Sequence, residues 1–242
     1  MSRFHAPCPL VIGTVCDLPE ATVRHMQVHR LQPGDAVDVF NGEGGVYRVR
    51  IAQMSRQGIA VEVLAHEATE CEPTRAVHLA VAMPANDRMD WLVEKATELG
   101  VHRISPLMSA RSVLKLEGER ALKKQAHWQA IAANACAQCG RNRVPRIEVP
   151  LRLDHWLGQH PRGEPWAVLS LQAQRHAADA LASPEWANAR QLTWLLGPEG
   201  GLTETEEQQA LAAGAEALSL GPWVLRVETA AIAALVTSVT PH

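Results

Sequence analysis

The chain has 242 residues, of which 47% are hydrophobic and 20% are charged, so it can bury a core and is not a disordered segment. Its length suits one or two domains. The longest nearly apolar stretch, residues 230–239, is too short to span a membrane, and the first residues lack a signal-peptide core, so we expect a soluble cytoplasmic protein.

The charge of the chain is uneven along its length. The formal net charge is -3 in total, and counting by segment gives -3 for residues 1–72, +5 for 73–150 and -5 for 151–242. The basic middle segment suits contact with phosphate groups or an ordinary solvated helix face, and charge alone does not separate the two readings.

Residues 1–72 are typical of short strands. Residues 37–40 lead into a glycine-rich turn at 41–45, and 47–51 then alternate apolar and polar side chains, which predicts a hairpin. A further alternation follows at 59–63. We expect a small antiparallel barrel or sheet, whose Arg48 and Arg50 either touch RNA or keep an exposed face soluble, the second being favoured.

The alternation stops near residues 70–74, which are acidic and contain a proline, as in a linker. We set the linker at 73–76 and expect an α/β domain after it. Strand-like runs alternate with helical stretches, which indicates a mostly parallel sheet covered on both faces. The predicted strands are 77–82, 101–107, 166–171, 192–196 and 217–220.

Helix signals lie between these strands. Asp87 is placed to cap a helix whose apolar stripe is Met89, Leu92, Val93, Ala96 and Leu99, and residues 119–139 contain no glycine or proline. Thr203 and Glu206 form a predicted capping box. The last helix is predicted to bury the face that carries Ile232, Leu235, Val236 and Val239.

The five cysteines are scattered, which argues against a disulfide framework. Cys136 and Cys139 are a close pair, but no second pair of ligands stands at a matching spacing nearby. We therefore expect no metal site.

Two loops carry the signals for a ligand site. Residues 197–202, Gly-Pro-Glu-Gly-Gly-Leu, lie between a predicted strand and a capped helix, an arrangement that lets a ligand approach the backbone closely. The second loop, 221–229, carries Arg226 and Glu228 just before the last helix. Both follow strands of a parallel sheet, where ligands bind beyond the carboxyl ends. Neither a Walker loop nor a dinucleotide fingerprint is present. A tight structural turn and a simple ion pair are the plain alternatives.

Four motifs together resemble the RsmE family of bacterial rRNA methyltransferases. They are RMDWLVEKATELGV at 88–101, QCGRNRVP at 138–145, GPEGG at 197–201 and LGPWVLRVETA at 220–230. The resemblance implies an enzyme that methylates N3 of a uridine in 16S rRNA of the small ribosomal subunit, with S-adenosylmethionine as cofactor. Trp223, His29 and residues 84–86 depart from the family pattern.

The fold implied by this resemblance is an α/β SPOUT-type methyltransferase domain at 77–242, tied into a deep trefoil knot, after a PUA-like β-barrel that binds RNA at 1–72. A homodimer is also implied. The expected cofactor contacts are Leu171, Leu196, Gly197, Pro198, Glu199, Gly200, Gly201, Leu218, Leu220, Gly221, Val224 and Leu225.

For the chemistry, we expect Arg226 to stabilise the uridine anion and Glu228 to accept or orient the proton. The target base must be unpaired or extruded, because pairing occupies N3. The expected RNA contacts are Arg3, Arg48, Arg88, Arg111, Arg141 and Arg143. Two alternatives remain: a SPOUT methyltransferase acting on another RNA site, and a non-catalytic RNA-binding assembly factor.

Overall fold

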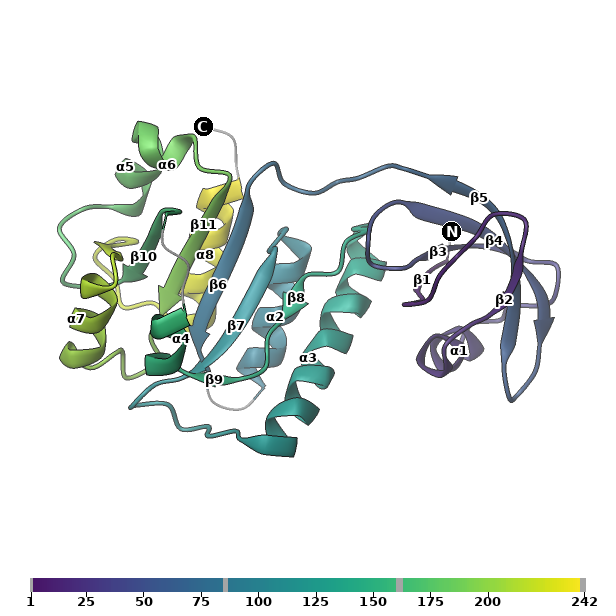
Figure 1. Cartoon of the computed structure of the whole chain (residues 1–242), viewed down its shortest axis with the longest axis horizontal. Coiled ribbons are helices and arrows are strands. Elements are labelled where there is room, and N and C mark those ends of the chain that lie inside the picture. Colours follow the sequence, from purple (N-terminus) through teal and green to yellow (C-terminus); the bar gives the residue numbers. More distant parts are fainter. Residues whose placement is uncertain (1, 85–86, 160–162, 240–242) are drawn as a thin grey trace. The chain divides into compact units, whose positions relative to one another are not determined.

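The computed structural model describes residues 2–84, 87–159 and 163–239 (Figure 1). The chain divides into two compact units, one formed by residues 1–72 and 133–144 and the other by 73–132 and 145–242. Of residues 84–86, which depart from the family's sequence pattern, residues 85 and 86 lie outside the described residues.

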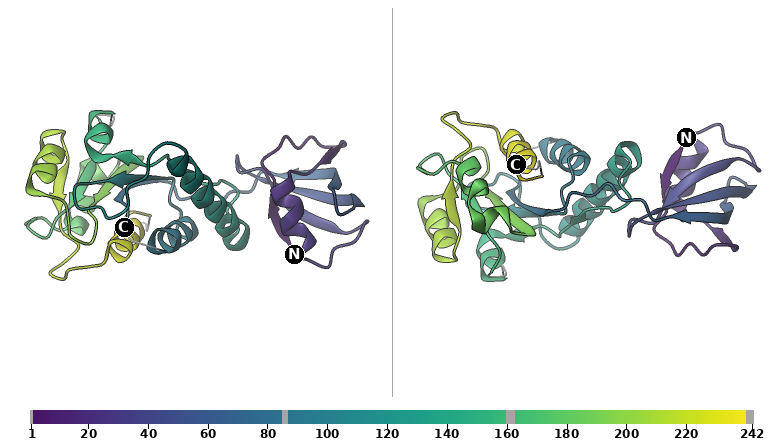
Figure 2. Two further views of the ribbon diagram at one scale, coloured as in Figure 1. Left: turned by 90° about the horizontal axis from the view of Figure 1, so that it is seen from below. Right: turned by 90° about the horizontal axis from the view of Figure 1, so that it is seen from above.

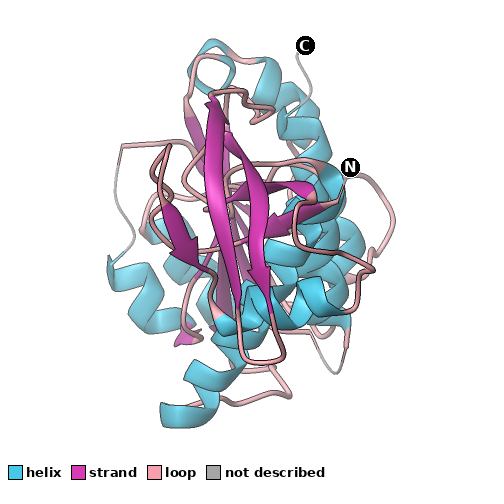
Figure 3. Cartoon of the chain, turned by 90° about the vertical axis from the view of Figure 1, so that its right-hand side faces the viewer, coloured by secondary structure: helices cyan, strands magenta, loops and turns pink. Residues whose placement is uncertain are grey.

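The first unit is built on a sheet with strand order β1-β3-β4-β5-β2. The predicted hairpin is confirmed, because β3 and β4 pair in antiparallel fashion, and β5 pairs with β4. Strands are drawn in magenta in Figure 3. All neighbouring strands are antiparallel except β1 and β3, which run parallel. The elements are β1 (Arg3–His5), β2 (Val15–Asp17), α1 (Glu20–Gln27), β3 (Ala36–Phe40), β4 (Val46–Met54) and β5 (Ile59–Glu67).

Residues 133–144 belong to this unit, and hydrogen bonds and ion pairs connect them to residues 1–72. Arg3 donates to the carbonyl oxygen of Gly140 at 3.0 Å. Arg141 is only 4% exposed, and its Nε donates to the Glu72 carboxylate at 3.1 Å. Arg143 pairs with Glu70 at 3.2 Å. The alternation of apolar residues in 1–72 gave no sign that this distant segment completes the unit.

The second unit contains a parallel sheet with strand order β12-β10-β11-β6-β7-β8, and β9 also pairs with β7. The expectation of a mostly parallel α/β sheet is confirmed. Its strands are β6 (Ala76–Ala82), β7 (Arg103–Met108), β8 (Arg146–Ile147), β9 (Leu151–Arg152), β10 (Trp166–Leu169), β11 (Gln191–Leu196) and β12 (Glu216–Leu218).

Helices cover both faces of this sheet (Figure 2). On one face, Trp194 of β11 donates from its indole to Ser238 of α8 at 2.8 Å. The next side chain along the strand, Leu195, packs in a cluster with Trp156 of α4 and Ala210 of α7. The helices of the second unit are α2 (Arg88–Glu98), α3 (Gly118–Cys139), which continues into residues of the first unit, α4 (Leu153–Gln159), α5 (Ala177–Ala182), α6 (Pro184–Ala187), α7 (Glu204–Ala212) and α8 (Val227–Val239).

The predicted helix signals are met in part. The capping box of α7 is present, with the Thr203 hydroxyl accepting from the Glu206 backbone. Asp87 occupies the N-cap position of α2, but its side chain makes no capping hydrogen bond. Met89, Leu92, Val93 and Ala96 are buried as expected, and Leu99 is partly exposed.

The predicted buried face of α8 is wrong in part. Val236 is 41% exposed, whereas Ala231, Ala234, Leu235 and Ser238 are buried. Almost every side chain of this helix is small or apolar, so the sequence contrast that identifies a buried face is weak.

No helix among the described residues combines the length and the apolar character needed to cross a bilayer.

Candidate functional site

A pocket lies at the carboxyl ends of β10, β11 and β12, three neighbouring strands of the second unit. Its volume is about 370 Å³, within the roughly 300–1,000 Å³ usual for small-molecule sites. The loops that follow the three strands supply most of its lining, which includes residues 169–172, then 196–199, 201 and 202, and then 218, 220, 221 and 223–225. Because parallel strands end at the same edge, loops far apart in sequence converge there.

The glycine turn at 197–202 forms one wall. A side chain at Gly197 would place its Cβ 2.7 Å from the backbone nitrogen of Leu202, so the turn closes only around glycine here. Gly201 has a φ of +70°, in the left-handed region, and its amide donates to the Pro198 carbonyl at 2.7 Å. The turn is therefore tight and preformed.

Contacts from the loop after β7 brace this turn. Arg111 donates from Nη1 to the carbonyl oxygens of Gly200 at 2.6 Å and Leu202 at 3.3 Å, and it also lines the pocket. The backbone amide of Ala110 donates to Glu206 Oε1 at 2.7 Å. The same Glu206 completes the capping box of α7, so turn, helix and neighbouring loop are held together.

The second wall is the loop between β12 and α8. Ser219 fixes its start, because the Ser219 hydroxyl accepts from the Gly221 amide at 3.0 Å and donates to the Gly221 carbonyl at 3.1 Å. Gly221 has a φ of +129°, which favours glycine at this bend. Trp223 and Val224 follow, with 72% and 79% of their surfaces exposed.

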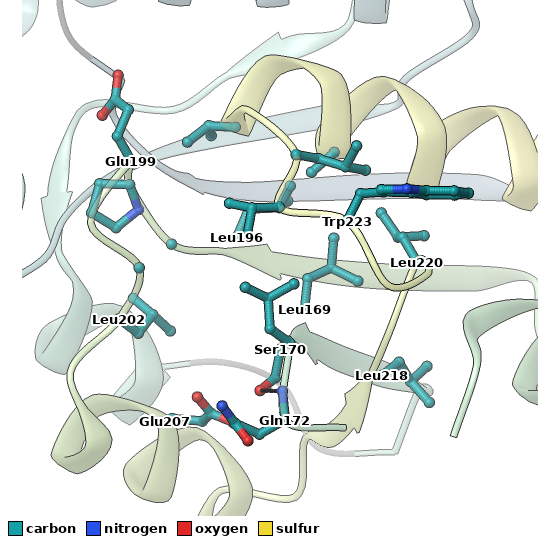
Figure 4. Close-up of a pocket in the computed structure, with 18 of the residues that line it drawn as sticks. Leu169, Ser170, Gln172, Leu196, Glu199, Leu202, Glu207, Leu218, Leu220 and Trp223 are labelled. Atoms are coloured by element: carbon teal, nitrogen blue, oxygen red, sulfur yellow. Dashed lines mark hydrogen bonds between the residues drawn. The ribbon is translucent and has the colours of Figure 1, made fainter. Parts of the chain in front are cut away.

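The interior of the pocket is apolar and its ends carry polar groups (Figure 4). In this view Leu169 and Leu196 lie in the middle and Leu218 lies toward one side. Gln172 and Glu207 lie at the lower edge, Glu199 lies at the upper left and Trp223 at the upper right. Such a surface fits a ligand with an aromatic ring system joined to hydroxyl and charged groups.

The structure brings together nearly all the predicted cofactor contacts. Leu171, Leu196, Gly197, Pro198, Glu199, Gly201, Leu218, Leu220, Gly221, Val224 and Leu225 line the pocket. Gly200 is not part of the lining, although Arg111 binds its carbonyl. Leu202, Trp223 and Val227, which lie in the two predicted loops, also line it. Sequence reasoning missed five further lining residues, Leu169, Ser170, Gln172, Glu207 and Ala230.

The missed residues show where a signal existed. Residue 171 was placed inside a predicted strand, but β10 ends at Leu169, and residues 170–172 turn into the pocket. Glu207 lies one turn into α7 and lines the pocket. The capping box predicts where this helix starts, but it does not predict which of the nearby carboxylates faces the pocket.

The two residues proposed for the chemistry lie beside the pocket without forming its lining. Arg226 is exposed between Leu225 and Val227, both of which line it. Glu228 is in the first turn of α8, and its Oε2 is buried without a hydrogen-bond partner among the described residues. A buried carboxylate oxygen of this kind is a group that a ligand can satisfy.

The arginines proposed to contact RNA have varied surroundings. Arg3 and Arg141 direct their guanidinium groups to partners within the first unit. Arg48 pairs with Asp38 at 3.1 Å and Arg88 with Glu199 at 2.8 Å. The Arg143 side chain is 56% exposed. Contact with RNA stays a prediction for each.

The cysteine pair has a plain structural setting. Cys136 is buried, its thiol donates to the carbonyl of Arg143, and burial raises the pKa of this thiol to about 12. Cys136 is therefore protonated at neutral pH. Within residues 2–84, 87–159 and 163–239, no group of three or more His, Cys, Asp or Glu side chains is arranged to hold a metal ion.

Comparison with known proteins identifies a family. Residues 70–238 match the model of an RNA methyltransferase domain, and residues 18–64 match an RNA methyltransferase PUA domain. A crystal structure of ribosomal RNA small subunit methyltransferase E from Neisseria gonorrhoeae bound to S-adenosyl methionine is similar, with a TM-score of 0.87 and 34% identity. The match covers 97% of this chain and 95% of that one.

Curated relatives agree. Ribosomal RNA small subunit methyltransferase E of Bacillus subtilis is 31% identical over 88% of this chain and 85% of its own length. The protein of the same name from Mycobacterium bovis is 32% identical over 86% and 79%. The first unit thus contains a PUA-like domain, and the chain belongs to the family of ribosomal RNA small subunit methyltransferase E.

Proposed function

We propose that this protein is an enzyme that transfers a methyl group from S-adenosylmethionine to N3 of a uridine in 16S rRNA of the small ribosomal subunit. The observation that carries this proposal is the preformed pocket between the glycine turn and the loop before α8. A similar chain, of 34% identity, was crystallised with S-adenosyl methionine bound.

The residues of the pocket suit this cofactor. The leucine-lined middle would take the adenine ring, because that surface is apolar and lacks competing charges. Gln172 and Glu207 would bind hydroxyl or ammonium groups, since amide and carboxylate oxygens accept hydrogen bonds. When bound, S-adenosylmethionine supplies an electrophilic methyl group.

Arg226 and Glu228 would prepare the uridine. The N3–H of uracil is weakly acidic, and its loss leaves negative charge spread over N3 and the two carbonyl oxygens. The exposed guanidinium of Arg226 would bind that charge as it develops. Glu228, whose Oε2 has no hydrogen-bond partner among the described residues, would accept or orient the proton.

RNA binding would use both units. The first unit presents Arg48 and the exposed Arg143, and the second unit presents Arg88 beside the glycine turn. These groups would contact phosphates, so binding should weaken as the salt concentration rises. We further propose that the protein works in the cytoplasm, where it meets the small subunit.

Two finer structural features belong to the same proposal. The methyltransferase domain would be a SPOUT fold tied into a deep trefoil knot, as the resemblance of the four sequence motifs implies. A homodimer is supported by the apolar side chains that α2 and α8 leave exposed, Trp91 and Val236.

The deciding experiment is methyl transfer from labelled S-adenosylmethionine to 30S subunits that lack the modification, followed by nucleoside analysis. We expect 3-methyluridine with the parent protein. Arg226→Ala should lower kcat roughly 100-fold or more, as loss of a charge-stabilising donor does, with Arg226→Lys intermediate. Cofactor binding by calorimetry serves as the folding control.

The other outcomes identify the alternatives. A different labelled nucleoside from the parent would assign the protein to another RNA site. Cofactor binding without labelling of any RNA would favour a non-catalytic assembly factor, and either result would overturn the proposal.

A further inference from the structure

The loop between β12 and α8 carries an aromatic side chain that the cofactor alone does not account for. Trp223 lines the pocket, yet 72% of its surface is exposed. Two other exposed apolar side chains, Leu171 at 59% and Val224 at 79%, line the same pocket. Exposed apolar groups that line one pocket mark a surface that another molecule covers.

The position of Trp223 is held by its own loop. Gly221 bends with a φ of +129°, and a Cβ built there would lie 3.5 Å from two carbons of the six-membered ring of Trp223. The indole therefore packs beside Gly221. The Ser219 hydroxyl stabilises the bend, because it accepts from the Gly221 amide and donates to the Gly221 carbonyl. The ring is presented at the mouth by a braced segment.

The inner and outer parts of the pocket suit different ligands. Leu196 is 2% exposed and Leu218 is fully buried, so the interior is a closed apolar surface for a small molecule. Ribosomal RNA is too large to enter, and its target base must reach the interior from the mouth, where Trp223 lies. The in-line transfer to N3 requires that base to be held in one orientation.

We infer that Trp223 is the stacking platform for the extruded uracil, holding the base over the mouth of the cofactor pocket three residues before Arg226. This inference rests on the proposed function. An indole face binds any base by stacking, without the screening by salt that weakens ionic contacts. Trp223 would set the plane of the ring, and Arg226 would bind the charge that develops on it.

The test compares side chains that separate stacking from simple apolar contact. Trp223→Phe keeps an aromatic ring, Trp223→Leu keeps apolar surface without one, and Trp223→Ala removes both. Val149→Ala is the matched control, because Val149 is an exposed apolar side chain of the same unit, at 43%, outside this pocket. For each protein, kcat and KM for unmodified 30S subunits, the cofactor Kd and the molar mass in solution are measured.

We expect Trp223→Ala and Trp223→Leu to raise KM for the subunits by roughly 10- to 100-fold, the range for loss of one base–aromatic stack. The KM of Trp223→Phe for the subunits should stay within a few-fold of the parent value, because an aromatic ring remains. The cofactor Kd of all variants should be unchanged within about twofold, because the leucine-lined interior is intact. The raised KM of Trp223→Ala and Trp223→Leu should persist at high salt.

Three results would overturn the inference. A weaker cofactor Kd that accounts for the whole loss would assign Trp223 to the cofactor. A change in molar mass would assign it to contact between two copies of the chain, and parent-like kinetics of Trp223→Ala would leave it no role in base binding. Failure of the proposed function is distinguishable, since the parent protein itself would then form no 3-methyluridine.

Discussion

Arg111 braces the glycine turn of the pocket, a role that its positive charge alone does not predict. The sequence placed it among the residues that contact RNA. In the structure its guanidinium donates to the carbonyl oxygens of Gly200 and Leu202 and lines the pocket. A positive group so placed both fixes the turn and offsets the negative ends of its carbonyl dipoles.

Removing Arg111 should therefore weaken cofactor binding. We expect Arg111→Ala to raise the cofactor Kd by roughly 5- to 20-fold, in line with about 1–2 kcal/mol for charged hydrogen bonds partly open to water. Arg111→Lys should restore little, because an ammonium lacks the planar set of donors. Calorimetric titration measures the Kd, with Arg120→Ala on the exposed start of α3 as the control.

An unchanged cofactor Kd combined with weaker subunit binding would contradict this prediction. It would return Arg111 to the RNA contacts that the sequence suggested.

At the scale of elements, one carboxylate joins two helices of the second unit. Asp90 of α2 accepts from the indole of the buried Trp128 at 2.8 Å and from His127 Nε2 at 2.7 Å, both on α3. Burial pushes the pKa of Asp90 up, but the hydrogen bonds from His127 and Trp128 outweigh it and hold this pKa below its ordinary value. The charged form is therefore the one that stabilises the fold.

Asp90→Asn should lower the stability of the second unit by roughly 1–3 kcal/mol at pH 7, the cost of weakening bonds to a buried donor. Because the folded pKa is depressed, the extra stability is present above the unfolded value of 3.8 and is lost as pH falls below it. The difference between parent and variant should therefore shrink below about pH 4.

Urea unfolding followed by tryptophan fluorescence measures this difference in one unit alone, because all seven tryptophans lie between residues 73 and 242. Glu119→Gln, an exposed acidic position in the first turn of α3, is the control. A difference between parent and Asp90→Asn that stays constant from pH 7 to acid would show that the ionised carboxylate contributes nothing.

The elements that the sequence predicts well are those whose own residues decide them. The strands β6 and β11 are continuous buried runs, and the capping box of α7 is local. The strands β8 and β9 have two residues each and exist only because β7 pairs with both. No pattern within two residues predicts such a strand, so only the assembled sheet reveals it.

The same reason explains the candidate site. The glycine turn and the loop before α8 are recognisable because their glycines and their position after strands are local features. The partner of Arg141 is Glu72, 69 residues earlier in the chain, so its burial is invisible to a count of charges. Long-range pairing decides which arginines reach solvent.

At the scale of the whole molecule, the helices α2 and α8 leave an apolar surface exposed. They pack against each other, and Trp91 of α2 and Val236 of α8 are 46% and 41% exposed. The α8 helix carries one charged side chain, Glu228, in its first turn and none beyond it. A helix with so few polar groups is stable in water when a further surface covers it.

A second copy of the chain is the covering surface that our proposal implies. Val236→Asp would place a charge in that interface, and burying an unpaired carboxylate is costly. We expect the parent to have the molar mass of a dimer at micromolar concentration and Val236→Asp to shift toward the monomer, as measured by light scattering after size exclusion.

Val149→Asp is the matched control, because Val149 is 43% exposed in the same unit, outside these two helices. It should leave the molar mass unchanged. A parent protein that is monomeric throughout would refute the homodimer, and equal dissociation by both variants would show that added charge acts nonspecifically. If the dimer forms and Val236→Asp alone dissociates it, the exposed face of α8 explains why the predicted buried face of this helix included a residue that the isolated chain leaves in water.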